Sequence, residues 1–402
     1  MKKIMILGAS ILQLPAIRQA KQMGLQVVAV DMNPNAVGFL EEGIECEIVS
    51  TIDIPAVLKA AKKHQIKGIM TLASDMPVRT VAVVAKELGL VGISEDAAIK
   101  ATNKALMRDA LHAYDVPMPK YFKVSSKEEY KSIIQNFSNA YIVKPADNSG
   151  SRGIYVVFDH TDKKVAMTAY DYSRKYSRNG EVVVEEYMRG PEVSVETISF
   201  NGVCHVIQIT DKLTTGAPHF VEMGHSQPSM LEDSTKRIIA EVAIAANHAL
   251  GIKSGPSHTE IIVTKEGPKI VELGARLGGD CITTHLVPLS TGVNMVDACI
   301  RIAIGEKPDL EIKYQLSSAI RYFQQKAGRI KFISGIDIAK QIPGVEEICI
   351  VHGNGESITN ITDSASRMGF VIAKSDMPSS AIQICEKAID CIKIEMEHKN
   401  EA

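Results

Sequence analysis

The 402-residue sequence contains no tryptophan, and none of its seven cysteines forms a CxxC pair. An odd number of widely spaced cysteines argues against a disulfide framework and against a zinc site built from paired cysteines. We therefore expect reduced thiols in a cytoplasmic protein. The cysteines are Cys46, Cys204, Cys281, Cys299, Cys349, Cys385 and Cys391.

The sequence also lacks long apolar runs and an excess of charge of either sign. No segment approaches the ~20 apolar residues of a membrane-spanning helix. The apolar stretch of MKKIMILGAS is only about five residues long and continues into a glycine turn, so we do not expect a signal peptide. A formal net charge of −2 gives no electrostatic basis for binding nucleic acid or an anionic membrane. With 45% hydrophobic and 23% charged residues, the composition is that of a globular protein.

Apolar strands and helices alternate in the first 93 residues, which is typical of an open parallel sheet with covering helices. Ligands of such sheets bind at the carboxyl ends of the strands, where we expect Gly8–Ser10, Asp31 and Ser74-Asp75. The dinucleotide fingerprint is missing, because GASILQLP has one glycine where GxGxxG has three. This sheet is therefore expected to contribute at most the rim of a substrate site. The expected strands are Lys3–Leu7, Val27–Val30, Gly68–Leu72 and a short one near Val91.

The rest of the chain predicts a mixed α/β and α+β protein of three domains. After an open-sheet domain at 1–93 we expect a two-lobed domain at 94–305, with a small lobe at about 115–180 and a large lobe at about 181–305. Residues 306–402 are expected to form a small α+β domain that ends in a helix at Ser379–Glu395. Thr214–Ser229 has no clear periodicity and is expected to be a loop.

A glycine loop at Asp147–Gly153 lies between two expected strands, and Lys144 closes the first of them. Its small residues allow several backbone N–H groups to face one anion, and serine hydroxyls and Arg152 add donors. A lysine before such a loop suits a nucleotide phosphate. The loop is not of the Walker A type, because GK[ST] and a following helix are both missing. A plain hairpin turn is the alternative.

A second polar segment, Glu185-Glu186-Tyr187-Met188, ends an apolar strand, and Glu192 follows the next turn. A carboxylate and backbone amides at a strand end can bind an adenine edge, and another carboxylate can hold ribose hydroxyls. Glutamates at strand ends are also common without any such role, so the segment by itself leaves both interpretations open.

A β-hairpin is expected over His258–Leu273, with its turn at Lys265–Pro268. The natural register places Glu260 opposite Glu272 on a face shared with Ile262 and Ile270, while Ile261, Val263, Val271 and Leu273 line the other face. Like charges opposite each other destabilise a strand pair unless a cation lies between them. Mg²⁺ prefers carboxylate oxygens and substrate phosphates. Two solvated glutamates are the alternative interpretation.

Three further polar residues are candidates for a substrate pocket. His258 lies two residues before Glu260, so its side chain should point to the same face of the strand. Glu222 can hold a substrate ammonium group, and His225 can act as a base for an incoming amine. Structural hydrogen bonding by these groups remains the alternative in each case.

Taken in order, four motifs resemble the ATP-grasp superfamily over residues 1 to about 305. The motifs are Lys104 in TNKALMRDALHAYDVPMP, Lys144 in YIVKPADNSGSRG, the segment EEYMRGPEVSVE, and the Glu260/Glu272 hairpin that ends in Arg276. The resemblance implies ATP held between two lobes. It also implies an acyl phosphate, made from a carboxylate substrate, which an amine then attacks with release of ADP and phosphate.

The resemblance implies a role for each matching residue. Lys104 and Lys144 would contact phosphates, and the mobile loop containing Ser149, Gly150, Ser151 and Gly153 would close over them. Glu185 would contact the adenine amino group, the backbone of Glu186, Tyr187 and Met188 would recognise the ring, and Glu192 would hold the ribose. Glu260 and Glu272 would bind Mg²⁺ or Mn²⁺, and Arg276 would lie near the γ-phosphate and the acyl phosphate. Together with the pocket candidates named above, this makes Lys144, His258 and Arg276 the expected catalytic residues, and Glu222, His225 and Arg276 the expected substrate contacts.

One position departs from the family's pattern. Many members have asparagine two residues after the second glutamate, where this chain has Gly274 in ELGAR. The form ELGARLGGD, with GPSHTE and HFVEMGHSQPS before it, is similar to the carboxylate–amine ligases that join amino acids. We expect amino-acid substrates and a homodimer. The alternatives are a purine-pathway or carbamoyl-phosphate type of ligase, and an ATP-binding sensor without turnover.

Overall fold

The structure is a computed structural model that describes residues 1–397. The first part of the chain forms a four-stranded parallel sheet in the order β3-β2-β1-β4, which confirms the expected open parallel sheet. Val91 lies in a bend and not in the expected short strand. The elements are β1 (Lys3–Leu7), α1 (Leu14–Gln22), β2 (Gln26–Asp31), β3 (Glu45–Ile48), α2 (Ile54–His64), β4 (Gly68–Thr71), α3 (Val78–Glu87) and α4 (Glu95–Ala101).

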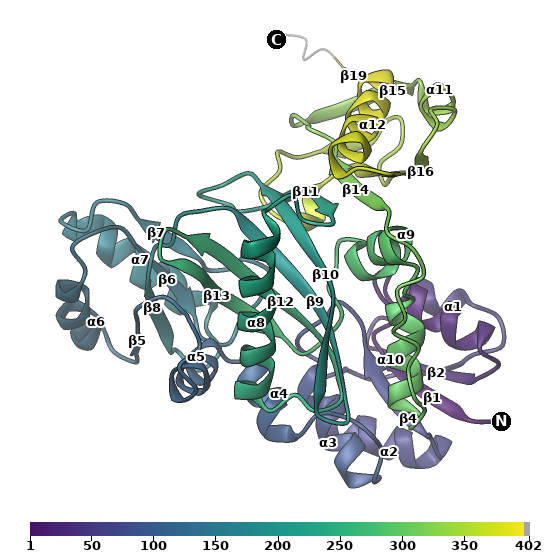
Figure 1. Ribbon diagram of the computed structural model, residues 1–402, viewed down its shortest axis with the longest axis horizontal. Helices are drawn as coiled ribbons and strands as arrows, with labels where there is room; N and C mark the ends of the chain where they lie inside the picture. Colours follow the sequence, from purple (N-terminus) through teal and green to yellow (C-terminus); the bar gives the residue numbers. More distant parts are fainter. Residues whose placement is uncertain (398–402) are drawn as a thin grey trace.

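A second, antiparallel sheet has four strands in the order β5-β8-β6-β7 and lies at the left of Figure 1. Helix α7 packs against it, and Tyr130, Tyr141 and Tyr170 are buried in the core between them. The elements of this part are α5 (Lys104–Ala113), β5 (Tyr121–Val124), α6 (Lys127–Ile133), β6 (Tyr141–Pro145), β7 (Tyr155–Val157), α7 (Lys163–Tyr176) and β8 (Val182–Glu186).

The largest sheet has eight antiparallel strands in the order β13-β12-β9-β10-β11-β14-β18-β16. Helix α8 (Asp233–Leu250) covers one face at the centre of Figure 1. The expected loop at Thr214–Ser229 was wrong in part, because Glu222–Gln227 forms strand β11 between β10 and β14. The strands are β9 (Glu192–Phe200), β10 (Val203–Thr214), β11, β12 (Gly255–Thr264), β13 (Gly267–Gly274), β14 (Ser317–Tyr322), β16 (Val345–Ile350) and β18 (Gly369–Ser375).

Helix α10 (Met295–Ala303) joins the N-terminal sheet to the large sheet. Its residue Met295 shares the largest core cluster with Ile4 and Ile6 of β1 and with Ile320 of β14. Among residues 1–397, no single helix is long and apolar enough to cross a membrane. One pair of helical segments bent by 114°, Ile282–Thr291 with Met295–Ala303, has the length and apolar composition of a span, on those two criteria alone.

The last part of the chain adds strands to the large sheet and builds a smaller sheet in the order β17-β15-β19. This part of the chain lies at the top of Figure 1. The terminal helix α12 (Pro378–Cys391) ends before the expected Glu395, because Lys393–Met396 forms strand β19 beside β15. Residues 398–402 of the expected C-terminal domain lie outside the described range. The other elements are α9 (Val287–Thr291), β15 (Gly328–Ser334), α11 (Ile336–Lys340) and β17 (Ser357–Ile358).

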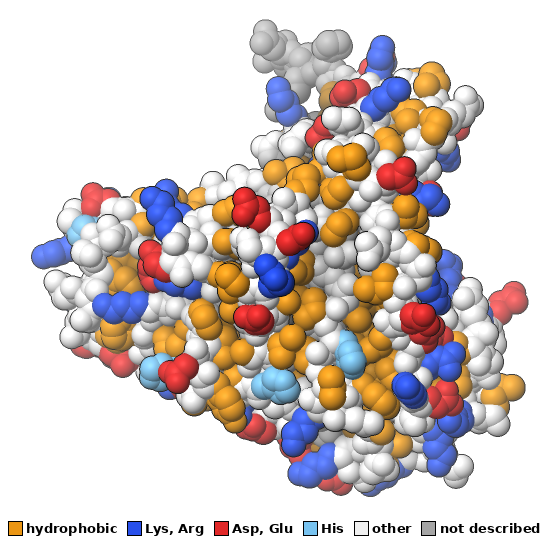
Figure 2. Space-filling view, in the orientation of Figure 1, with side chains coloured by type: hydrophobic (Ala, Val, Ile, Leu, Met, Phe, Trp, Pro, Cys, Tyr) orange, Lys and Arg blue, Asp and Glu red, His pale blue; other side chains and the backbone are white. Residues whose placement is uncertain are grey.

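Neither sign of charge dominates the visible surface, and the cysteines are unpaired. On the face shown in Figure 2, acidic and basic side chains are interspersed. All seven cysteines are free, as expected.

Candidate active site

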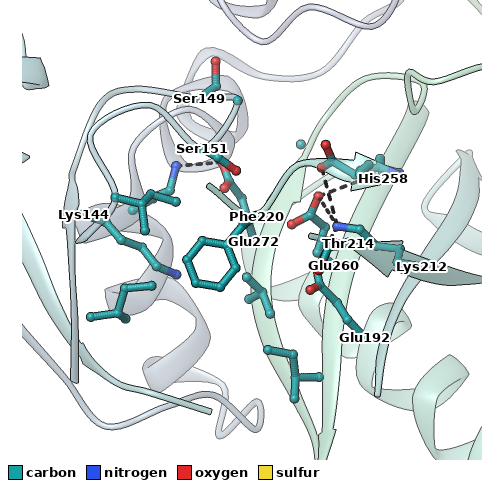
Figure 3. A pocket seen from close by; sticks show the side chains of 18 of the residues that line it. Lys144, Ser149, Ser151, Glu192, Lys212, Thr214, Phe220, His258, Glu260 and Glu272 are labelled. Atoms are coloured by element: carbon teal, nitrogen blue, oxygen red, sulfur yellow. Dashed lines mark hydrogen bonds and ion pairs between the residues drawn. The ribbon is translucent and has the colours of Figure 1, made fainter. Parts of the chain in front are cut away.

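A cavity of about 590 Å³ lies between the small sheet and strands β9–β13 of the large sheet. Its size falls within the usual range of ligand sites. Figure 3 shows Lys144, Ser149 and Ser151 on one side, facing Glu192, Lys212 and Glu260 on the other. The cavity is lined by these expected residues: Lys104, Lys144, Ser149, Gly150, Ser151, Glu185, Glu186, Tyr187, Met188, Glu192, Glu222, His225, His258, Glu260, Glu272 and Arg276.

Two expected features of the site lie elsewhere. Gly153 does not line the cavity. It packs against α7, where an added Cβ would lie 2.5 Å from Tyr176 Cβ. From the N-terminal sheet, Ala73 and Asp75 reach the cavity, whereas Asp31, at the end of β2, accepts a hydrogen bond at 2.9 Å from Ala9 N in the turn after β1. The N-terminal part therefore supplies a rim to the cavity.

The hairpin places two carboxylates at the cavity wall. Glu260 is paired with Glu272 across β12 and β13, which confirms the expected register. The expected faces were partly wrong, because a bulge follows this pair and aligns Ile261 with Ile270, leaving Val271 without a partner. Ile270 therefore enters the core, and Val271 lines the cavity beside Glu272.

Lys104 bridges the two sides of the cavity. It begins α5, behind the N-cap Asn103, and its Nζ donates to Glu272 Oε1 at 2.8 Å and to the Asn148 carbonyl at 2.7 Å. One ammonium group thus holds the hairpin carboxylate and the start of the glycine loop together.

Lys144 and Arg108 share a buried carboxylate. Glu185 is 1% exposed, and its oxygens lie 2.7 Å from Arg108 Nε and 3.0 Å from Lys144 Nζ. Burial by itself would raise the pKa of Glu185, but the two cations outweigh it and lower the pKa to about 2. Each carboxylate oxygen of Glu185 thus faces one cation, with Oε1 beside Arg108 and Oε2 beside Lys144.

Lys212, which no motif in the sequence indicated, lies at the centre of an acidic cluster. Its Nζ is 2.6 Å from Glu192, 3.1 Å from Glu260 and 3.9 Å from Glu222. Figure 3 shows the ammonium between the first two of these. Burial opposes the charge, but the carboxylates outweigh it and raise the pKa of Lys212. The alternation of β10 could have indicated an inward-facing lysine, but no local signal indicates its three partners.

His258 is held between two glutamates. Its Nδ1 lies 2.6 Å from Glu196 Oε1, and its Nε2 lies 3.5 Å from Glu260. Burial lowers the pKa of His258, yet the adjacent Glu196 outweighs burial and raises the pKa to about 9. The imidazolium and Lys212 together keep the pKa of Glu260 well below its usual value, against the effect of burial.

The opposite end of the cavity is built around Asp280. Arg367 makes a bidentate pair with it at 2.7 and 2.8 Å, and His225 Nε2 lies 3.4 Å from the same carboxylate. Burial is again outweighed, and the pKa of Asp280 is lowered. The C-terminal part also contributes Ser364, whose hydroxyl donates to Glu222 at 3.1 Å. Neither Arg367 nor Ser364 was indicated by sequence.

The donor set for a metal consists of Glu260 and Glu272. Among residues 1–397, no three His, Cys, Asp or Glu side chains are grouped to hold a metal ion. The Glu260 and Glu272 side chains are 25% and 29% exposed at the cavity wall. Two such carboxylates suit Mg²⁺ when a phosphate supplies further oxygens. The residues therefore fit this ion together with a phosphate ligand.

Comparison with known families adds direct information. The family model of the ATP-grasp domain matches residues 137–284, and that of the L-amino acid ligase C-terminal domain 2 matches residues 321–397. The chain therefore contains an ATP-grasp domain, and its last part matches a domain of L-amino acid ligases.

Individual proteins are similar to this chain over different lengths. An uncharacterised protein of Sinorhizobium fredii is 28% identical over 362 residues, covering 87% of this chain and 73% of the relative. The alanine–anticapsin ligase of Bacillus subtilis is 27% identical over 249 residues, covering 56% of this chain and about half of the relative, 52%. The crystal structure of the L-amino acid ligase from Bacillus licheniformis has the same fold, with a TM-score of 0.86, 23% identity and 99% of each chain covered.

Proposed function

We propose that this chain is an ATP-grasp ligase that forms an amide or peptide bond between a carboxylate and an amine, both from amino acids. ATP would phosphorylate the carboxylate to an acyl phosphate, and the amine would displace phosphate, leaving ADP and phosphate as products. The observation that carries the proposal is the cavity in which Lys104 and Lys144 lie with Arg276 and the Glu260–Glu272 pair.

The nucleotide would lie between the small sheet and the hairpin. Lys104, Lys144 and the loop at Ser149–Ser151 would bind its phosphates, since they bring cationic and N–H donors to one side of the cavity. Glu185 lies in the cavity wall where the adenine amino group would bind, and Glu186–Met188 supplies backbone groups beside it. Glu192 would hold the ribose hydroxyls.

Phosphoryl transfer requires positioning and charge neutralisation more than covalent help from the protein. Mg²⁺ held by Glu260 and Glu272 would neutralise phosphate charge. Arg276 would orient the γ-phosphate and then the acyl phosphate. His258, fixed by Glu196, would keep Glu260 ionised and in place. Closure of the glycine loop would exclude water, which otherwise hydrolyses the acyl phosphate.

The amine would enter at the end of the cavity lined by Glu222 and His225. Glu222 has a partly exposed carboxylate that can hold an ammonium group before the amine is deprotonated, and His225 would accept that proton. Ser364 adds a C-terminal residue to this wall, and Arg367 holds Asp280, which also lines the cavity. We further propose a cytoplasmic homodimer and the three-domain division at about residues 93 and 305.

The test is phosphate release from ATP and Mg²⁺ with a panel of amino acids and small carboxylates. ADP and phosphate with at least one amino-acid pair are expected. AMP with pyrophosphate, or phosphate release that needs only bicarbonate or formate, would overturn the proposal. Glu272→Ala should abolish turnover without unfolding the protein. Glu266→Ala, at the exposed turn of the same hairpin, is the matched control and should retain turnover.

A further inference from the structure

Asp75 and Arg276 form a contact between parts of the chain that are 201 residues apart. Asp75 follows β4 in the N-terminal sheet, and Arg276 follows β13 of the metal-site hairpin. Arg276 Nε donates to Asp75 Oδ1 at 3.0 Å, and Nη2 reaches Oδ2 at 3.5 Å. Both side chains are largely buried at the cavity wall. The N-terminal sheet thus touches the arginine expected to bind the transferred phosphate.

Gly274 lies directly beneath this pair. Its φ is outside the left-handed region, so its backbone conformation does not require glycine. A Cβ at this position would instead lie 2.9 Å from Asp75 Oδ1 and 3.2 Å from Arg276 Nε. Since side chains two residues apart on a strand share a face, a side chain at 274 would enter the cavity next to Glu272. That space is filled by the Asp75 carboxylate.

We propose that Asp75 is a positioning residue that aims the Arg276 guanidinium, and that glycine at position 274 leaves the room it needs. A carboxylate fixes the plane of a guanidinium fork through two parallel contacts. Without Asp75, the guanidinium would turn toward the other carboxylates that act on it, Glu260 and Glu272. The arginine would then leave the phosphate and would also occupy the metal ligands. The role assigned to Arg276 rests on the proposed function.

The side-chain test compares Asp75→Ala and Asp75→Asn with wild type. Displacement of a positioned group by about 1 Å can lower turnover by roughly 100-fold, so Asp75→Ala should lower kcat by about 10- to 100-fold. The affinity for ADP measured without a divalent cation should be unchanged, because this ligand lacks the γ-phosphate and needs no metal ligand, and Asp75→Asn should be intermediate. Asp297→Asn is the matched control, because it removes a carboxylate 2.6 Å from Arg301 on the surface of α10. It should leave kcat unchanged.

The steric part is tested by a double-mutant cycle with Gly274→Ala. The single variant should lower kcat, because its methyl group displaces Asp75. The double variant Asp75→Ala/Gly274→Ala should be no slower than Asp75→Ala, because the displaced group is already gone. Gly353→Ala, where an added Cβ meets no atom within 4 Å, is the control for the substitution itself.

Two results would overturn the inference. One is an Asp75→Ala variant that keeps the wild-type kcat and loses only melting temperature, which would mean that the Asp75–Arg276 pair stabilises the fold and does not position the arginine. The other is multiplicative losses of kcat in the double variant. If the wild-type enzyme released no phosphate, the proposed function would fail instead. Melting temperatures of the same three variants would then still test whether a side chain at 274 displaces Asp75. Additive shifts in melting temperature would then contradict it.

Discussion

Arg108 Nε donates a 2.7 Å hydrogen bond to Glu185 Oε1, and each of the two side chains is 1% exposed. The same guanidinium donates to the Val271 carbonyl at 2.7 Å. Helix α5, strand β8 of the small sheet and strand β13 of the hairpin therefore meet at one buried cation. Since the cavity lies between these elements, Arg108 fixes their separation without lining the cavity itself.

We predict that Arg108→Met destabilises the protein by about 3–5 kcal/mol, because it leaves a buried carboxylate that Lys144 alone must neutralise. Urea unfolding at pH 7 measures the change. The control is Lys127→Met, which breaks an exposed pair with Asp171 and should cost at most about 1 kcal/mol. Equal losses in free energy of unfolding in the two variants would show that the buried Arg108–Glu185 pair contributes no more to stability than an exposed pair.

Local patterns in the sequence predicted the hairpin well. The Gly267-Pro268 dipeptide and the flanking apolar runs indicated a register that places Glu260 opposite Glu272, as observed, although the turn itself is Lys265-Glu266 and Gly267-Pro268 begins β13. Prediction of the faces failed at Val271, because a bulge changes the alternation without a distinct residue signature. Strand β11 was missed for a related reason, since its buried residues His225, Ser226 and Gln227 are polar and give no apolar period.

The charged partners of the site could not be predicted, because each pair joins distant segments. Asp75 and Arg276 are 201 residues apart, and Asp280 and Arg367 are 87 apart. Their proximity depends on how whole sheets pack. Lys212 belongs to the same class, since its three glutamates come from different strands. A sequence can indicate that a charged residue is buried, but only the packed structure identifies its counter-ion.

Asp280→Asn should reduce stability in a pH-dependent way. The pKa of Asp280 is lowered in the folded state, against burial, by Arg367 and His225, whereas an unfolded aspartate titrates near 3.9. The pair therefore stabilises the fold fully above about pH 5 and less as the pH falls below about 4. We expect a loss of about 1.5–3 kcal/mol at pH 7. Asparagine tolerates the positive φ of 51° at this position, so no backbone strain is added.

Urea unfolding of wild type and Asp280→Asn between pH 3 and pH 8 measures this linkage. The difference in free energy of unfolding should be largest at neutral pH and should shrink toward pH 3. A difference that stays constant over the whole range would mean that the charge of Asp280 contributes nothing.

Gly190→Ala should disrupt the turn between β8 and β9, which joins the small sheet to the large one. Gly190 has a φ of 153°, and an added Cβ would clash with the Val263 carbonyl oxygen. Neighbouring Pro191 accepts a hydrogen bond from Val263 N at 2.9 Å, so the backbone has little room to move. We predict a loss of more than about 2 kcal/mol in urea unfolding.

Gly202→Ala separates backbone strain from the steric clash at Gly190. Gly202 also has a positive φ, of 82°, but a Cβ there meets no atom within 4 Å. The cost of left-handed backbone for alanine is about 1–2 kcal/mol, and Gly202→Ala should show no more than that. If both variants lost the same stability, the close approach to Val263 would not matter.

Lys212→Met should convert the acidic cluster into a site that depends on a divalent cation. Without the ammonium group, Glu192 and Glu260 remain as adjacent carboxylates with less compensation, so the metal-free protein should melt at a lower temperature than wild type. A cation that binds the folded state and not the unfolded one raises stability with the logarithm of its concentration divided by its Kd. Mg²⁺ should therefore raise the melting temperature of Lys212→Met more than that of wild type. Lys236→Met, which breaks a surface pair with Asp233, is the control and should respond to Mg²⁺ as wild type does. An equal response in Lys212→Met and wild type would show that Lys212 does not compete with a cation for these carboxylates.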